Sequence, residues 1–493
     1  MAEEPRMKRA KRSFPSGTCG YRGTVIHSLD LGQLEIIRDG IVVVDSEGFI
    51  IQVFDMSQNP DVPESLKVQD LSGKLIMPGF VDGHAHAPQY AFTGTGMDLP
   101  LLQWLEKYTF PCESKFSDLE FALEVYEKSV KRHLKFGTTF CSYFATIHMD
   151  ACKVLTEVAR TLGQRAYIGK VSMDRNSPDF YCENTEDAID DAEAFVQHVL
   201  EVSKQPLPAK PGCKKILAQI RKSAVQRNMS IGNLTDCAED DDEDSACTLS
   251  SPTETTTSTP DSSKDGVEDS SEEDIELRAR GGDIILKGKL GSAKKVRTSS
   301  DDTATGVVPK VPLVLPVVTP RFVPSCTSRL LGALGQISRR YAVPVQSHLS
   351  ESPGEIAWVR ELHPECDTYT GVYDRYGLLH DRAYYAHCCH CSKGERKMMQ
   401  VRGAGVVHCA SSNFMLGSGV LNVRRLLQEG VKVGLGTDVA GGYSSSMLDA
   451  LRQALIASQA VSFGGGAAPD EEEGECPKTY DPLSFQEAFH LAT

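Results

Sequence analysis

The sequence predicts an α/β protein whose main domain is a parallel (β/α)8, TIM-like barrel, preceded by a small β domain. From residue 78 onward, short apolar runs alternate with stretches of helical periodicity, as in consecutive βαβ units. The runs that predict strands number eight and start near Pro78, Thr138, Ala166, Leu315, Val343, Ala383, Gly405 and Val431. Eight such units imply a closed barrel, with its chemistry at the C-terminal ends of the strands.

Residues 21–77 predict the small domain, which we expect to be β-sandwich-like. Residues 40–44 and 48–53 are rich in β-branched residues and flank a turn at 45–48. Because the chain ends at Thr493, we expect this domain to be incomplete, with unpaired sheet edges, and the barrel to be truncated at its end. Residues 1–20 predict a disordered tail, in which the basic run at 8–12 also matches a nuclear address.

An insertion divides the predicted barrel into residues 78–205 and residues 313–493. Residues 206–312 contain an acidic run at 239–244 and a Ser/Thr/Pro-rich run at 250–263. Such a stretch cannot bury enough apolar area to offset the entropy of ordering, so we predict a disordered acidic, Ser/Thr-rich insertion. Among the barrel helices, the one that ends near Gly137 begins with a capping-box pattern, in which Ser117 is the expected cap and Glu120 its partner.

The composition excludes several classes of protein. The chain has 493 residues, a formal net charge of −15 and no basic face, which argues against nucleic acid as a partner. No run of about eighteen apolar residues is present, so we expect no transmembrane helix and no membrane partner. The first residues lack the apolar core of a signal peptide, and the fifteen cysteines then indicate reduced thiols. We therefore expect a cytosolic protein.

The ends of the predicted strands carry the residues that can bind a metal. His84 and His86 lie two positions apart at the end of the first barrel strand, so both imidazoles face one way. His348 closes the fifth strand, and Asp438 follows the eighth. Three imidazoles and a carboxylate at one barrel mouth predict a catalytic zinc site, because such zinc takes about three protein ligands plus water. A single strand-end histidine is more often structural, so the prediction rests on the whole set.

Other strand-end residues predict proton transfer. Glu351 lies just past the fifth strand, where it can shuttle protons between water and substrate. His387 closes the sixth strand and can stabilise negative charge that develops on the attacking oxygen. Asp438 can bind the ion or accept the proton of the water, although an aspartate at this position could also cap a helix. His408, at the end of the seventh strand, fits a pocket wall and a structural hydrogen bond equally well.

The run at 387–391, His-Cys-Cys-His-Cys, has the composition of a zinc cluster. Adjacent side chains on one short stretch cannot all face one ion. We therefore favour a functional His387 beside structural cysteines.

Several motifs resemble the amidohydrolase superfamily and, within it, the guanine deaminases. The superfamily pattern is Pro-Gly-Phe-Val-Asp-Gly-His-Ala-His at 78–86, followed by His348, His387 and Asp438. The narrower resemblance rests on longer stretches, at 87–92, 98–105, 107–111, 143–148, 318–322, 346–351 and 436–444. It covers about residues 20–205 and 313–493.

This resemblance implies a cofactor and a set of substrate contacts. One zinc ion per chain is implied, bound by His84, His86, His348 and Asp438. Purine contacts are implied for Gln89, Arg321 and Phe322, with His86 and His348 also beside the substrate. Arg321 suits a ring carbonyl and Phe322 a flat heterocycle. A surface salt bridge is the alternative role for Arg321.

The implied reaction is the hydrolysis of guanine to xanthine and ammonia by a homodimeric enzyme of purine catabolism or salvage. Glu351 would protonate the ring nitrogen beside the reacting carbon, and Asp438 would carry the proton of the water to the leaving amine. Two other hypotheses stay open: an aminohydrolase acting on an adenosine-like or triazine-like ring, and a non-catalytic scaffold. An assay across purines, combined with a zinc measurement, distinguishes the three.

Overall fold

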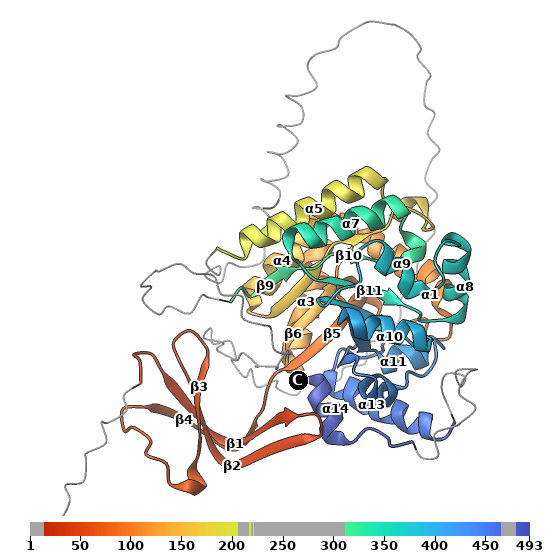
Figure 1. Cartoon of the computed structure of the whole chain (residues 1–493). Coiled ribbons are helices and arrows are strands. Elements are labelled where there is room, and N and C mark those ends of the chain that lie inside the picture. The colour runs from red at the N-terminus through yellow and green to blue at the C-terminus, as the bar shows by residue number, and fades with distance from the viewer. Residues whose placement is uncertain (1–13, 206–215, 218–219, 221–310, 465–479) are drawn as a thin grey trace, which may run out of the picture. The chain divides into compact units, whose positions relative to one another are not determined.

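The structure, a computed structural model, describes residues 14–205, 216–217, 220, 311–464 and 480–493 (Figure 1). Most of the predicted insertion and most of the predicted tail therefore lie outside the described residues. Within the tail, Phe14 packs edge-on against Phe54, and the first strand already begins at Cys19. At the start of the predicted insertion, Ile216, Leu217 and Ile220 are buried in an apolar core cluster.

The N-terminal domain is one four-stranded sheet in the order β3-β2-β1-β4. Its strands are β1 (Cys19–Asp30), β2 (Gln33–Val44), β3 (Ile50–Asp55) and β4 (Lys67–Ile76). The predicted turn at 45–48 joins β2 to β3, with the Asp45 carboxylate accepting hydrogen bonds from the backbone N–H groups of Glu47 and Phe49. The described residues of this domain form a single layer, so the second layer of a sandwich stays a prediction.

Eight parallel strands form the main domain, as two sheets of four (Figure 1). The first sheet contains β5 (Phe80–His86), β6 (Thr138–Phe144), β7 (Arg165–Gly169) and β9 (Val314–Pro316). The second contains β11 (Val345–Leu349), β12 (Ala383–His387), β13 (Gly405–His408) and β14 (Lys432–Leu435). The eight strands predicted from the apolar runs are thereby confirmed. A short parallel pair, β8 (Val171–Ser172) with β10 (Thr319–Pro320), lies beyond β7 and β9.

Backbone contacts join the two sheets at both sides. On one side, Val318 forms a parallel bridge with Val345 of β11. On the other, the Asp438 N–H, just past β14, donates to the His84 carbonyl of β5 at 2.8 Å. The result is a TIM-barrel-like α/β fold, although no continuous ladder of eight strands is assigned within the described ranges.

Helices follow the strands along the chain, as βαβ connections require. The longer ones are α3 (Leu119–Lys135), α4 (Met149–Leu162), α5 (Thr185–Val202), α7 (Ser328–Tyr341), α8 (Pro353–Leu362), α9 (Tyr369–Arg375), α10 (Lys393–Arg402), α13 (Met447–Ser462) and α14 (Phe485–Ala492). Shorter α-helices are α1 (Leu101–Trp104), α2 (Phe110–Glu113), α11 (Ala410–Met415) and α12 (Val423–Gln428). No helix in the described part of the chain is long and apolar enough to cross a bilayer.

The predicted cap of α3 is wrong by one residue. Asp118, not Ser117, has the extended backbone of a cap, and its carboxylate accepts from the backbone N–H of Glu120 at 2.9 Å. The Ser117 hydroxyl instead donates to the Ser114 carbonyl, because residues 114–117 form a turn of 3₁₀ helix. Both residue types are good caps, so the pattern alone could not choose between them.

The close packing of α7 makes a testable prediction about stability. A methyl group on Gly335 would collide with the backbone carbonyl of Tyr376, whereas one on Gly332 of the same helix would make an ordinary contact. We expect Gly335→Ala to lower the free energy of unfolding by about 1–3 kcal/mol because the backbone must shift. Gly332→Ala should raise it by about 0.5–1 kcal/mol through helix propensity. Urea unfolding of both variants measures this, and equal effects would contradict it.

Candidate functional site

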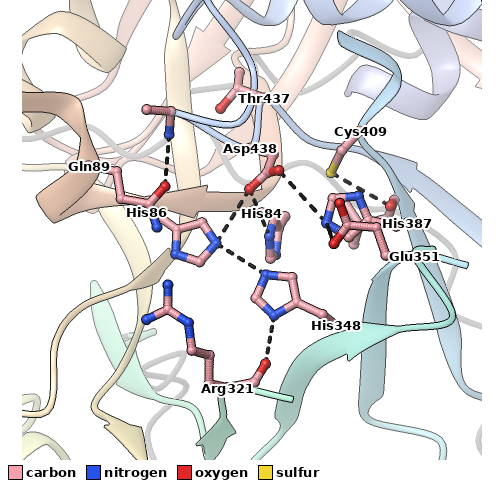
Figure 2. Close-up of polar contacts among 12 residues, drawn as sticks. His84, His86, Gln89, Arg321, His348, Glu351, His387, Cys409, Thr437 and Asp438 are labelled. Carbon is pink, nitrogen blue, oxygen red and sulfur yellow. Dashed lines mark hydrogen bonds and ion pairs between the residues drawn. The ribbon is translucent and has the colours of Figure 1, made fainter. Parts of the chain in front are cut away.

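Four side chains from three segments that are distant in sequence converge where the strands end (Figure 2). His84 and His86 come from β5, His348 from β11, and Asp438 from the segment after β14. Their ligand atoms all lie within 4.8 Å of one another. Asp438 Oδ1 is 3.1 Å from His84 Nε2 and 3.4 Å from His86 Nε2, and the Nε2 atoms of His86 and His348 are 3.2 Å apart. The four predicted metal ligands are therefore together.

The orientation of these groups fits a metal ion. The His348 Nδ1–H donates to the Arg321 carbonyl at 2.6 Å, which leaves the Nε2 lone pair facing the cluster. His84 Nε2 is buried without a hydrogen-bond partner, although Asp438 is close. Burial holds the pKa of His86 and of His348 well below its usual value, which favours the neutral form of both rings. Neutral imidazoles and a carboxylate aimed at a common point are a donor set that zinc prefers.

The carboxylate of Asp438 is kept ionised by its surroundings. Burial alone would raise its pKa, but the imidazoles of His84, His387 and His86 outweigh that effect and hold the pKa well below its usual range. Asp438 is also one of three site residues, with Ser350 and His387, whose backbone φ lies between +46° and +70°. Non-glycine residues in this left-handed region store strain that is common at functional sites.

A proton-transfer pair lies beside the ligand cluster. His387 Nε2 is 3.5 Å from Glu351 Oε2 and 3.7 Å from Asp438 Oδ2, so the imidazole stands between the two carboxylates. Asn413 holds the other ring nitrogen of His387 at 2.8 Å, and the Ser418 hydroxyl donates to Glu351 at 2.8 Å. Burial raises the pKa of Glu351. For His387, burial disfavours the charged form, but the facing carboxylates raise the pKa overall.

The sequence analysis did not predict that the buried carboxylate of Asp82 supports the residues of the ligand cluster. Asp82 is fully buried and accepts hydrogen bonds from the backbone N–H of His84 at 3.2 Å and of Thr437 at 3.0 Å. Its second oxygen accepts from the Thr437 hydroxyl at 2.6 Å. Asp82 thus ties the strand that carries two ligands to the residue before Asp438. The motif at 78–86 contains Asp82, but nothing local in the sequence indicates Thr437 as its partner.

The hydrogen bonds between Asp82 and Thr437 lead to a prediction about how tightly the chain binds the metal ion. We expect Thr437→Val to weaken metal affinity about 10- to 100-fold, because removing a group that orients metal ligands typically has this effect. Chelator competition at equilibrium measures it. Thr156→Val is the control, since Thr156 is an equally buried threonine that bonds only the Cys152 carbonyl on α4. Similar metal affinity in the two variants would contradict the prediction.

A pocket opens beside the ligand cluster and contains all the predicted substrate contacts. Its volume is about 400 Å³, counting the space open to solvent. The predicted residues that line it are His86, Gln89, Arg321, Phe322, His348, Glu351, His387 and Asp438. Leu101, Trp104, Leu105 and Leu416 complete the wall. These apolar residues were not predicted, because an apolar side chain on a short helix is ordinarily a core residue.

Gln89 and Arg321, the two polar residues predicted to contact the substrate, both bind the carboxylate of Glu113. Arg321 is 2% exposed, so the alternative of a surface salt bridge is wrong. The guanidinium nevertheless forms an ion pair, with the buried carboxylate of Glu113 at 2.6 Å. The Gln89 amide also donates to Glu113, at 2.8 Å. Phe322 is buried edge-on against Trp358, with ring centroids 6.3 Å apart.

The remaining candidates lie outside the pocket wall. His408 is 2% exposed, and neither ring nitrogen has a hydrogen-bond partner among the residues that the structure describes. Within the run at 387–391, the thiols of Cys388, Cys389 and Cys391 are buried. Among the described residues, that run does not appear in any group of donors close enough to bind one ion.

Comparison with known proteins agrees with the fold. A model of the amidohydrolase family matches residues 75–231 and 235–472. The chain belongs to the amidohydrolase family.

The relatives that it matches include several named as deaminases. The chain is 36% identical to "Guanine deaminase" of Dictyostelium discoideum over 96% of its length and 82% of the relative. It is 34% identical to "Guanine deaminase" of Homo sapiens, over 96% of its length and 80% of the relative. The crystal structure of a guanine deaminase from C. acetobutylicum, with guanine bound in the active site, superposes with a TM-score of 0.69 at 29% identity, covering 97% of this chain and 85% of that one. These matches identify a hydrolytic deaminase.

Proposed function

We propose that this chain is a zinc-dependent enzyme that hydrolyses guanine to xanthine and ammonia. The convergence of His84, His86, His348 and Asp438 beside a pocket lined by Gln89 and Arg321 carries the proposal. The names of the relatives support guanine as the substrate. A role in purine catabolism or salvage follows from that reaction.

Two residues of the chain would move the protons of this reaction. A zinc ion held by the four ligands would supply Lewis-acid activation of the attacking water. Glu351, protonated more readily because of burial, delivers a proton to the ring nitrogen next to the amino-bearing carbon. Asp438 accepts the proton of the water and passes it to the leaving amine. The second proton of the water then passes from the new hydroxyl on that carbon back to Glu351, which forms the ring carbonyl and restores the protonated Glu351, so that water and guanine become xanthine and ammonia.

His387 would interact with the carboxylates of both Glu351 and Asp438. Its Nε2 lies between Glu351 and Asp438, where it can stabilise negative charge that develops on the attacking oxygen. Arg321 would donate to the ring carbonyl, Gln89 to the same polar edge, and Phe322 would pack against the purine ring. Trp104 and Leu105 would exclude water from the other side of the ring.

Some features of the proposed enzyme rest on the family resemblance. We propose a closed eight-stranded barrel, one zinc ion per chain, a homodimer and a location in the cytosol. The two cross-sheet contacts, at Val318 and at His84, support the closed barrel.

The deciding experiment combines metal analysis with turnover. The purified chain should contain about one zinc ion and release ammonia from guanine, with little activity on adenosine or on a triazine. Activity on one of those rings instead would favour the second aminohydrolase hypothesis. Full zinc without turnover of any purine would favour a non-catalytic scaffold and overturn the proposal.

A further inference from the structure

A buried carboxylate behind the pocket wall has no role in the reaction proposed above. Glu113 ends α2 and is fully buried. It accepts hydrogen bonds from Gln89 Nε2 at 2.8 Å and from the Tyr181 hydroxyl at 2.8 Å. It also accepts from both terminal nitrogens of Arg321, at 2.6 and 3.2 Å. One carboxylate therefore holds both of the polar residues expected to contact the substrate.

These bonds give Gln89 and Arg321 single orientations. The Gln89 Nε2 points to Glu113 while its Oε1 accepts from the Ala440 backbone N–H at 3.2 Å, so the amide cannot flip without losing both bonds. The Arg321 guanidinium is fixed by a two-point contact and lies over the Phe110 ring at 5.1 Å. Because guanidinium has five N–H donors, others stay available to the pocket.

The same contact changes the charge of the pocket. A lone buried guanidinium would attract anions strongly, because the local dielectric is low. Burial alone would lower the pKa of Arg321, but Glu113 outweighs this effect and keeps the guanidinium charged. In the proposed complex, Arg321 therefore contacts the substrate as the cationic half of an ion pair whose net charge is zero. A neutral purine needs only the donors, whereas an anionic purine would gain from an uncompensated charge.

We propose that Glu113 is a positioning residue that aligns Gln89 and Arg321 for a neutral purine and cancels the Arg321 charge, so that anionic product is not retained. This inference rests on the proposed function, since it deepens the account of the same pocket. Xanthine is a stronger acid than guanine, so the product is the species whose release benefits.

Glu113→Gln tests the proposal because it keeps the size of the side chain and removes its charge. We expect KM for guanine to rise about 10-fold or more while kcat changes by less than about 3-fold, as for the loss of uniform binding. The readout of charge is inhibition by xanthine relative to neutral hypoxanthine, at a pH where xanthine is partly ionised. The ratio of the two inhibition constants should shift about 10-fold in favour of xanthine.

Glu395→Gln is the matched control. Glu395 is also a buried carboxylate, 6% exposed, that accepts from Thr370 and Ser392, but it does not line the pocket. Both variants should lose thermal stability, and only Glu113→Gln should change KM and the inhibition ratio. A Glu113→Gln variant that loses stability alone would overturn the proposal.

If Glu113→Gln does not fold, a second variant tests whether Glu113 aligns Gln89 and Arg321. Tyr181→Phe removes one donor to Glu113 and preserves its charge. KM for guanine should then rise about 2- to 5-fold with the inhibition ratio unchanged. An unchanged KM would overturn the alignment role. Guanine turnover by the unsubstituted chain tests the proposed function separately, so failure of one is distinguishable from failure of the other.

Discussion

Replacing Asp438 with asparagine is expected to reduce kcat/KM for guanine by on the order of 10³-fold or more and to reduce the bound metal well below one ion per chain. Asp438 provides the carboxylate of the four-residue cluster and lies within 3.4 Å of two of its imidazoles. The variant keeps the shape but loses the negative charge that binds the ion and the oxygen that accepts the proton. Metal assistance is worth several kcal/mol of transition-state stabilisation, which corresponds to this loss of rate.

The measurement pairs metal analysis by mass spectrometry with steady-state kinetics. Asp449→Asn is the control, because Asp449 lies in the first turn of α13, the helix after this segment, and bonds Ser444 and Arg452 without lining the pocket. It should retain metal and activity. If Asp438→Asn also retains both, the ligand set proposed here is wrong.

Replacing Glu351 with glutamine is expected to lower kcat about 10²- to 10⁴-fold, the range typical for losing a general acid or base. Metal content should stay near one ion per chain, because Glu351 is not a member of the ligand cluster. The KM should change little, since the amide preserves the bond from Ser418 and the size of the side chain. Loss of kcat with metal retained separates proton transfer from metal binding.

The control for this variant is Glu361→Gln, an exposed glutamate near the end of α8, the helix that follows Glu351. It should match the unsubstituted chain in kcat. A Glu351→Gln enzyme with unchanged kcat would contradict the assignment of Glu351 to proton delivery. Loss of both metal and activity would instead indicate that Glu351 supports the ligands.

The parts of the fold that could be predicted are those with a local signal. The eight barrel strands were predicted correctly because each is a short apolar run between helical stretches, and both patterns lie within a few residues. His84 and His86 were predicted to face one way by the alternation of side chains along a strand. The cap of α3 was placed one residue early, since Ser117 and Asp118 are chemically equivalent as caps.

The supports of the site could not be predicted, because their partners are far apart in the chain. Glu113 and Arg321 are separated by 208 positions, and Asp82 and Thr437 by 355. A glutamate at the end of a four-residue helix gives no local indication that it will be buried in an ion pair with a distant arginine. Only tertiary packing places Glu113 of α2 beside Arg321, which follows β10.

By itself, the sequence determined the order of strands and helices and the residue types at the strand ends. Both depend only on residues that are close together in the sequence: the hydrophobic periodicity of each element and the side chains that follow each strand. The tertiary structure alone decided which of those residues meet, how Gln89 and Arg321 are oriented, and where the charge of Arg321 is compensated. The physical reason is that burial and hydrogen-bond pairing depend on contacts between distant segments, and such contacts exist only once the chain is folded.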